Sequence, residues 1–254
     1  MRLTTVGTGA AAPDAHRVNA AHLVEAGDVR LLLDCGSGVV HRMATLGLDW
    51  SSITHLALTH FDADHVSDIA TLFVAWRWGQ LPPRSAPITV VGPPGTQALL
   101  ERLASALWDK LLAPGYPVHV EEVAPGGATT LGDGGTVTLR SQKVPHTDES
   151  VAYSVDHEGR RLVYTGDTAA DEGLAQWAAR CDVLLAECSL PDEMAVPAHL
   201  TPERVGALAA TANPGRLVLT HFYPPVERVD VAAIIGRHYD GPVVLAHDGW
   251  HTDV

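Results

Sequence analysis

Four metal-capable side chains lie within six residues of this chain, directly after an apolar run. The segment THFDADH occupies residues 59–65 and follows the apolar residues 53–58, so His60, Asp62, Asp64 and His65 are candidate ligands. Imidazole and carboxylate groups suit zinc, manganese and iron(II). A strand that ends in such a cluster places it on a loop at the carboxyl edge of a sheet, where distant ligands can converge. We therefore predict a metal site here, in preference to a polar loop with two structural histidines.

Three further candidate ligands occupy the same kind of position later in the chain. His146 follows the strand-like residues 136–144, Asp167 follows the apolar residues 161–164, and His221 follows the apolar residues 217–219. Each of them opens a loop after a strand, as the first cluster does. This repeated placement predicts that they complete a site for two metal ions.

The order of these motifs resembles a known family. THFDADH, PHT at residues 145–147, TGDT at 165–168 and LTHF at 219–222 are similar to the motifs of the metallo-β-lactamase superfamily, and most similar to its ribonuclease Z-like and phosphodiesterase branch. VGTGAAAP at residues 6–13, LLLDCGSG at 31–38 and HLT at 199–201 also fit. The resemblance implies a dinuclear metal-dependent hydrolase that forms a single domain over residues 1–254.

The strand and helix pattern independently favours an α/β protein built as a four-layer αββα sandwich. Roughly twelve strands are predicted in two runs, each closed by helices, which is the pattern of two sheets with helices outside them. In the first run we predict helices over residues 37–47, 65–78 and 95–110. In the second run we predict helices over 171–179, 201–212 and 228–238. The metal site is then expected at one edge of the sheets.

The resemblance also implies a ligand set. One ion would be held by His60, Asp62, His146 and Asp167, and the other by Asp64, His65, Asp167 and His221. Asp167 would bridge the two ions, because a carboxylate has two oxygens, and Asp64 is counted among the catalytic residues as well. A water or hydroxide between the ions would be the nucleophile.

Asp62 departs from the usual H-x-H-x-D-H motif, in which a histidine stands at this position. Zinc is the metal expected for both sites, but a carboxylate is a harder ligand than imidazole and shifts the first site toward manganese or iron. The substitution could also leave that site weak, so a metal-poor binding protein is an alternative.

His199 is the candidate proton donor. It precedes a helix start in which Thr201 is the expected N-cap and Pro202 the first helical residue. A histidine fixed there has a suitable pKa to protonate a leaving alkoxide. Glu187 is expected to orient His199 or to lie behind the ligands. The sequence leaves open whether Cys188, His247 and His251 touch the site.

Charge and chain length guide the substrate prediction. The net charge is −13 and no basic run is present, whereas proteins that bind nucleic acid gather Lys and Arg. About twenty residues separate His146 from Asp167, too few for the long basic arm with which bacterial ribonuclease Z grips tRNA. We therefore predict a phosphodiesterase for a small, nucleotide-like molecule and disfavour large RNA. A lactonase or an arylsulfatase-type esterase on the same metals is the alternative enzyme.

Three cysteines without a C-x-x-C motif are typical of a reducing compartment, so the cytoplasm is expected. No apolar stretch approaches the length of a membrane span, and no membrane partner is expected. Trp76 and Trp78 cannot share one helical face. One is expected in the core and the other at a substrate cleft or a dimer contact, which leaves a homodimer open.

Overall fold

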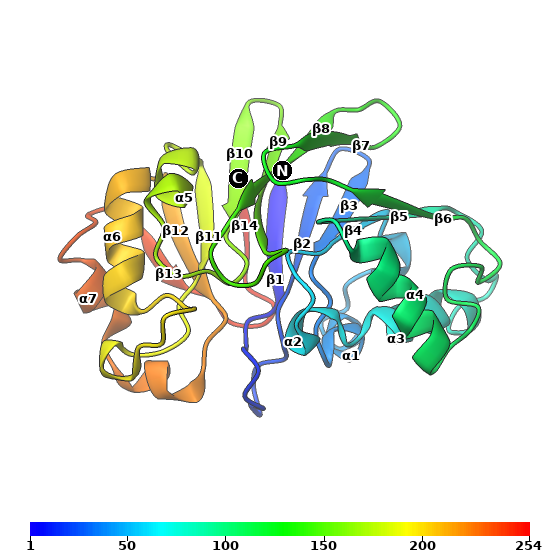
Figure 1. The fold of residues 1–254 in the computed structure, drawn as a ribbon, viewed down its shortest axis with the longest axis horizontal. Helices are drawn as coiled ribbons and strands as arrows, with labels where there is room; N and C mark the ends of the chain where they lie inside the picture. The colour runs from blue at the N-terminus through cyan, green and yellow to red at the C-terminus, as the bar shows by residue number, and fades with distance from the viewer.

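Two seven-stranded sheets form the centre of the computed structural model, which describes residues 1–254 (Figure 1). The first sheet has the spatial order β14 (His251–Asp253), β1 (Arg2–Gly7), β2 (Ala21–Ala26), β3 (Val29–Leu33), β4 (His55–Ala57), β5 (Ile88–Gly92) and β6 (Val118–Glu122). The second has the order β13 (Val243–Leu245), β12 (Arg216–Thr220), β11 (Val183–Glu187), β10 (Arg160–Tyr164), β9 (Val151–His157), β8 (Val137–Lys143) and β7 (Ala128–Leu131).

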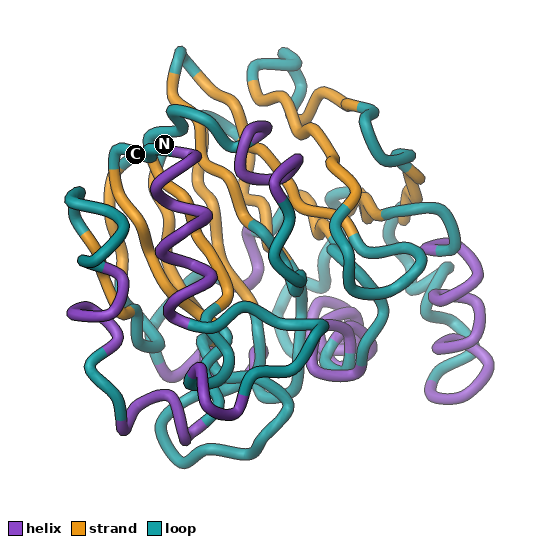
Figure 2. Tube along the Cα trace, turned by 60° about the vertical axis from the view of Figure 1, so that its left-hand side comes forward, coloured by secondary structure: helices purple, strands orange, loops and turns teal.

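Helices cover the outer face of each sheet (Figures 1 and 2). Those of the first half are α1 (Val39–Thr45), α2 (Ala63–Val66), α3 (Ile69–Trp78) and α4 (Thr96–Leu107). Those of the second half are α5 (Glu172–Trp177), α6 (Pro202–Ala212) and α7 (Val231–Ile235). Short 3₁₀ turns lie at Trp50–Ser52, Asp192–Met194 and Pro224–Arg228. No helix in the protein has both the length and the apolar character that crossing a membrane requires.

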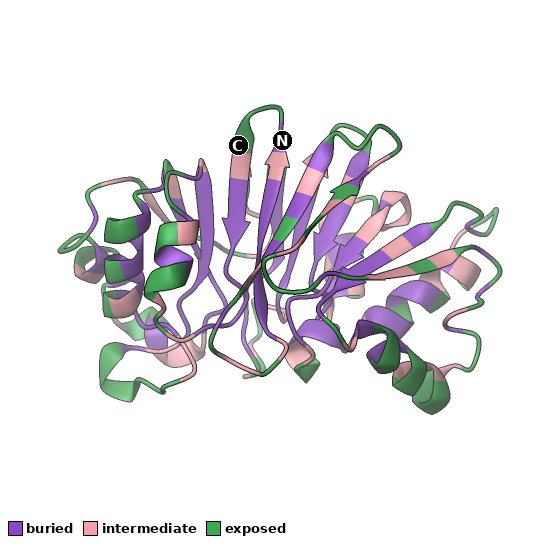
Figure 3. Cartoon of the chain, turned by 45° about the horizontal axis from the view of Figure 1, so that its top comes forward, coloured by how far each residue is buried: buried purple, intermediate pink, exposed green.

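Three apolar clusters hold these four layers together. One cluster lies between the two sheets, and each of the others lies between a sheet and its helices. Because both faces of the central strands are covered, those strands are buried along their length: all five residues of β11 are buried, and the first four are apolar. Figure 3 shows this buried centre and the exposed outer faces of the helices. The predicted αββα sandwich is confirmed.

Three secondary-structure predictions need correction. The helix expected over 65–78 is two helices, because the backbone N–H of Asp68 donates to the carbonyl of Cys35 (3.0 Å) and interrupts the helical ladder. The helix expected over 228–238 is reduced to α7, with a 3₁₀ turn before it. Strand β14 was not predicted, since His251–Asp253 is too short to show an alternating pattern. Trp76 is fully buried and Trp78 is 68% exposed, as the opposite faces of α3 require.

Two glycines allow loops to approach closely at the edge where the candidate ligands lie. A Cβ atom on Gly36 would lie 2.0 Å from the carbonyl oxygen of Asp64, and one on Gly166 would lie 2.9 Å from the Cβ of Thr59. Gly166 also has a φ of +57°, in the region that favours glycine. The Gly166 contact places the loop of Asp167 directly against the loop of residues 59–65, and the Gly36 contact places the loop after β3 against Asp64.

A buried carboxylate ties the end of the chain to its beginning. The Asp248 side chain is 2% exposed and accepts hydrogen bonds from the backbone N–H groups of Thr8 (2.9 Å) and Val18 (2.8 Å). It also accepts one from the Thr8 hydroxyl (2.7 Å) and lies 3.4 Å from the guanidinium of Arg42. This carboxylate fixes both ends of the loop between β1 and β2.

Replacing Asp248 should therefore destabilise the fold. Asp248→Ala leaves two buried N–H groups and a cation without their acceptor, and we expect a loss of at least ~2 kcal/mol in the free energy of unfolding. Urea denaturation followed by circular dichroism measures the change. Asp240→Ala, at an exposed carboxylate, is the matched control and should change stability little. Equal stability of the two variants would contradict this account.

Candidate metal centre

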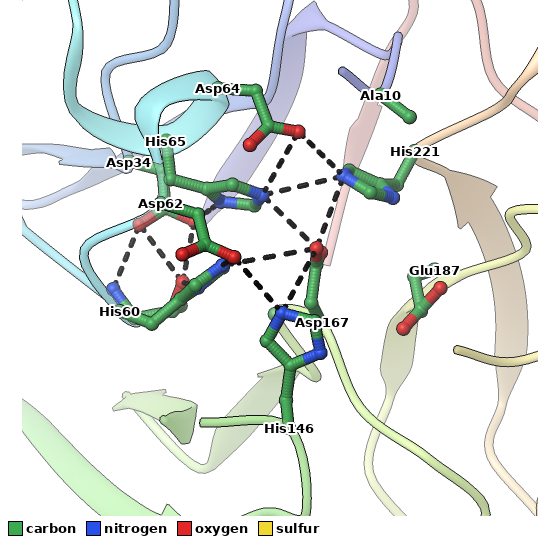
Figure 4. A network of polar contacts seen from close by, with 12 residues as sticks. Ala10, Asp34, His60, Asp62, Asp64, His65, His146, Asp167, Glu187 and His221 are labelled. Carbon is green, nitrogen blue, oxygen red and sulfur yellow. Dashed lines mark hydrogen bonds and ion pairs between the residues drawn. The ribbon is translucent and has the colours of Figure 1, made fainter. Parts of the chain in front are cut away.

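The candidate ligands come from four loops, each of which follows a strand. Residues 60–65 follow β4, His146 follows β8, Asp167 follows β10, and His221 follows β12. Figure 4 shows that their side chains point toward one another. The structure thus brings all seven predicted ligands together.

Asp167 lies at the centre of the cluster. Its side chain is 4% exposed, and its oxygens lie within 4 Å of the Nε2 atoms of four imidazoles. The distances are 3.3 Å to His65, 3.3 Å to His221, 3.8 Å to His60 and 3.9 Å to His146. Burial acts to raise the pKa of Asp167, but His221 and His65 outweigh it and hold that pKa well below its usual range.

The other two carboxylates lie on either side of Asp167. Asp62 Oδ2 is 3.3 Å from Nε2 of His146 and 3.6 Å from Nε2 of His60. Asp64 Oδ2 is 3.4 Å from Nε2 of His221 and 4.0 Å from Nε2 of His65. His60 and His146, which both lie beside Asp62, lower the pKa of Asp62 to about 2. Two groups of ligand atoms thus share Asp167 between them.

Each of the four imidazoles is held from behind through Nδ1, so that Nε2 faces the centre. The partners of Nδ1 are the Thr59 hydroxyl for His60 (2.9 Å), Asp34 Oδ2 for His65 (2.9 Å), the Ala198 carbonyl for His146 (3.1 Å) and the Ser189 hydroxyl for His221 (2.9 Å). Partners of this kind fix the orientation of metal-binding histidines. The rings are therefore aligned before any ion binds.

Two buried polar atoms at the centre lack hydrogen-bond partners. His60 Nε2 and Asp167 Oδ1 are buried and form no hydrogen bond, and Nε2 of His65 lies 3.3 Å from Nε2 of His221. Burying such groups unpaired is costly, and two imidazole nitrogens at this distance suit a shared cation better than each other. The residues therefore fit divalent metal ions, in groups that offer imidazole nitrogen and carboxylate oxygen.

Asp34 supports the cluster from the interior. It is fully buried and accepts hydrogen bonds from His65 Nδ1, from the backbone N–H of Thr59 (2.8 Å) and from the Tyr164 hydroxyl (2.9 Å). Burial opposes its charge, yet His65 and the N–H of Thr59 lower the pKa of Asp34. Its φ of +59° and the φ of +60° at His221 are rare for residues with a side chain, and strained backbone of this kind concentrates at functional sites.

His199 and Glu187 form a pair beside the cluster. His199 Nδ1 lies 3.1 Å from both carboxylate oxygens of Glu187, and Nε2 of His199 has no hydrogen-bond partner in the protein. Burial acts to lower the pKa of His199, but the hydrogen bond and charge of Glu187 raise it to about 9. The ring of His199 lies 5.0 Å from that of His146 and 5.6 Å from that of His221, measured between centroids.

The predicted helix start after His199 is confirmed. Thr201 is the N-cap of α6, its hydroxyl accepts from the N–H of Arg204 (3.4 Å), and Pro202 is the first helical residue. Arg204 also donates to the carbonyl of His199 (2.8 Å). The cap thus fixes the backbone that carries His199.

Sequence reasoning left several residues open or missed them. Cys188 is buried in the apolar cluster beneath the helices of the second half, and His247 and His251 are exposed outside the ligand groups.

Ser189 and Tyr223 were missed, although Ser189 lies two residues after Glu187 and Tyr223 two residues after His221. Both lie at the centre: Ser189 hydrogen bonds with His221, and the Tyr223 ring lies 6.1 Å from that of His221. Their spacing after a site residue is the only sequence signal for them.

An αββα sandwich with this cluster at its edge defines a metal-dependent hydrolase. Comparison with known families agrees: residues 29–222 match the model of the beta-lactamase superfamily domain. The chain therefore belongs to the metallo-β-lactamase superfamily, in its ribonuclease Z-like branch.

Relatives of known sequence span nearly the whole chain. Ribonuclease Z of Mycolicibacterium gilvum (strain PYR-GCK) is 30% identical, and the match covers 98% of this chain and 94% of that protein. Ribonuclease Z of Mycobacterium sp. (strain KMS) is 32% identical, over 89% of this chain and 85% of that protein.

Solved structures share the fold. The metallo-beta-lactamase fold protein YhfI from Bacillus subtilis superposes with a TM-score of 0.82 at 22% identity, over 99% of this chain and 98% of that one. The short form of human tRNase Z superposes with a TM-score of 0.79 at 24% identity, over 100% and 99% of the two chains.

These relatives correct the substrate prediction. The expectation of a small-molecule substrate, with large RNA disfavoured, is wrong, because the matched relatives are ribonucleases. The net charge of −13 was a poor guide, since it sums carboxylates over the whole surface. Binding of a polyanion depends on the field near the site, where bound cations are the largest local charges.

Asp34 offers a test of how the ligands are held. Asp34→Asn keeps the volume but removes the charge that orients His65, so we expect the affinity for the ion at His65 to fall by about 10- to 100-fold. Competition with a chromophoric zinc chelator measures that affinity. Asp133→Ala, at an exposed turn, is the control and should leave it unchanged. Undiminished affinity in folded Asp34→Asn would show that Asp34 has no part in metal binding.

Proposed function

We propose that this protein is a dinuclear, metal-dependent phosphodiesterase that cleaves RNA, and that residues 1–254 form one hydrolase domain. The observation that carries the proposal is the convergence of six further ligand side chains around Asp167, with the His199–Glu187 pair beside them. The name that the full-length relatives bear supports RNA as the substrate.

The ligand groups favour two ions that share Asp167. His60, Asp62 and His146 would complete one site, and Asp64, His65 and His221 the other. When bound, two such ions supply Lewis acidity, lower the pKa of a water and neutralise charge on the phosphate. Zinc is the metal we propose, with manganese or iron favoured at the first site by Asp62.

The protein's own residues would orient the site and supply a proton. Asp34, Thr59, Ala198 and Ser189 hold the ligand rings in place. Glu187 is buried and keeps His199 protonated, with Nε2 free to face the substrate. Cleavage of a phosphodiester produces an alkoxide, and His199 would protonate this leaving oxygen through Nε2.

This protein must bind RNA in another way than through a long basic arm of the kind found in bacterial ribonuclease Z. The segment between His146 and Asp167 folds as the short hairpin of β9 and β10, as predicted. The alignment with the Mycolicibacterium gilvum relative spans 274 positions, more than the 254 residues of this chain, so that relative has residues that this chain lacks. We therefore propose that contacts close to the metal centre provide much of the affinity.

A substrate panel tests the proposal. Protein loaded with zinc or with manganese would be incubated with a tRNA extended at both ends, an unstructured RNA of equal length, bis-p-nitrophenyl phosphate, a lactone and an aryl sulfate. We expect cleavage of RNA and of the small diester. Hydrolysis of the diester without RNA cleavage would contradict the proposal that RNA is the substrate. Hydrolysis of only the lactone or the sulfate would contradict the proposal that the reaction is phosphodiester cleavage.

Asp62 tests the first metal site. Asp62→Ala should remove one ion and leave the other, because Asp64, His65 and His221 remain. Asp62→His should raise zinc affinity relative to manganese and lower the activity measured with manganese, since imidazole suits zinc better. Elemental analysis and metal titration measure both effects. Asp109→Ala, at an exposed carboxylate, is the control, and unchanged metal content in Asp62→Ala would show that Asp62 is no ligand.

His199 tests the proton donor. His199→Ala should keep both ions and reduce kcat by on the order of 10²- to 10⁴-fold, because a positioned acid contributes that much to the rate. Glu187→Gln should reduce kcat less, and should have little further effect when added to His199→Ala, since it acts through that ring. His41→Ala, at an exposed histidine, is the control. Additive losses in the double variant would contradict a common role for the pair.

A further inference from the structure

Tyr223 is the one aromatic ring, apart from the histidines, that contacts His199. The centroid of its ring lies 6.4 Å from that of His199 at 66°, and 6.1 Å from that of His221 at 83°. It therefore presents its ring beside both the candidate proton donor and a candidate ligand. Nothing in the site as described above uses it.

The backbone under this ring is held on both sides. The N–H of Tyr223 donates to the carbonyl of Ser189 (3.0 Å), and its carbonyl accepts from the N–H of Val226 (3.1 Å). The preceding residue, Phe222, exchanges hydrogen bonds with the loop after β1, through the carbonyl of Thr8 (2.9 Å) and the N–H of Ala10 (3.3 Å). The ring thus stands on a fixed support, as a binding platform requires.

Tyr223 also lies on the open side of the centre. His60 and His65 are fully buried, whereas the side chains of Asp62, Asp64 and His199 are 52%, 13% and 15% exposed and Tyr223 is half-buried. A substrate that reaches the ions must approach from the side where the exposed groups lie. On the side of Asp64 and His199, such a substrate meets the ring of Tyr223.

We propose, on the basis of the function proposed above, that Tyr223 is a stacking platform for the nucleoside that carries the leaving oxygen. His199 must lie next to that oxygen to protonate it, and Tyr223 is the aromatic ring nearest to His199 apart from the histidines. Stacking on an aromatic side chain accepts any base, because every base has a π-face. A neutral phenol also adds affinity for RNA without the basic arm that this chain lacks.

Binding of mononucleotides to the zinc-loaded protein tests this role without catalysis. Calorimetry would compare adenosine 3′-phosphate and adenosine 5′-phosphate with ribose 5-phosphate and inorganic phosphate, which have no base. Tyr223→Ala should weaken binding of at least one adenosine phosphate on the order of 10-fold or more, and should barely change binding of the base-free probes. Tyr223→Phe should keep most of the affinity, and Tyr223→Leu should lose it despite its bulk.

Two controls exclude a merely structural effect. Metal content and thermal stability should match the wild type in all three variants. Trp78→Ala, at an aromatic ring that is 68% exposed on α3, should leave nucleotide binding unchanged. An equal loss for nucleotides and base-free probes, or full affinity in Tyr223→Leu, would overturn the proposal.

Cleavage of RNA separates this inference from the function on which it rests. An RNA that lacks the base at the cleaved nucleotide should have a raised KM with the wild type, and Tyr223→Ala should raise KM only for the intact RNA. If the wild type cleaves no RNA while nucleotide binding still depends on the base and on Tyr223, the proposed function fails and the platform stands. If RNA is cleaved and Tyr223→Ala changes neither binding nor KM, the platform fails and the function stands.

Discussion

The buried carboxylate of Asp167 is the interaction on which the rest of the site depends. An ionised group in the interior is stable only when opposite charge or hydrogen-bond donors surround it. Here four imidazole nitrogens approach its two oxygens, and they come from three other loops. The two sheets must therefore meet at this edge in one particular way, because any other arrangement leaves Asp167 buried and uncompensated.

The chemistry expected of the metal centre depends on the residues that hydrogen bond with the ligands and orient them. A hydroxyl, a carboxylate or a backbone carbonyl holds each imidazole at Nδ1. Ser189 hydrogen bonds with both His221 and Glu187, and Glu187 also hydrogen bonds with His199. One chain of hydrogen bonds thus connects a candidate metal ligand with the candidate proton donor. A change at Glu187 is expected to act mainly on the acid, because Ser189 keeps its own hydrogen bond with His221.

Local patterns in the sequence predicted much of this structure, because each ligand directly follows a strand and the strands alternate with helices. The features that were missed depend on contacts between distant segments. The break between α2 and α3 arises from a hydrogen bond between Asp68 and Cys35, and the pairing of β14 with β1 involves only three residues on each side. Tyr223 resembles any tyrosine after a strand until the fold places it against His199. The substrate was misjudged for the same reason, since net charge says nothing about where charges lie.

The origin of the ligands has a consequence for the lifetime of the protein. Residues 60–65 follow a strand of the first sheet, whereas His146, Asp167 and His221 follow strands of the second. An ion bound between them therefore cross-links the two halves of the sandwich, and the halves cannot separate while the ion is bound. Since a ligand that binds only the folded state stabilises that state by mass action, metal supply in the cell would set the resistance of the chain to unfolding and proteolysis.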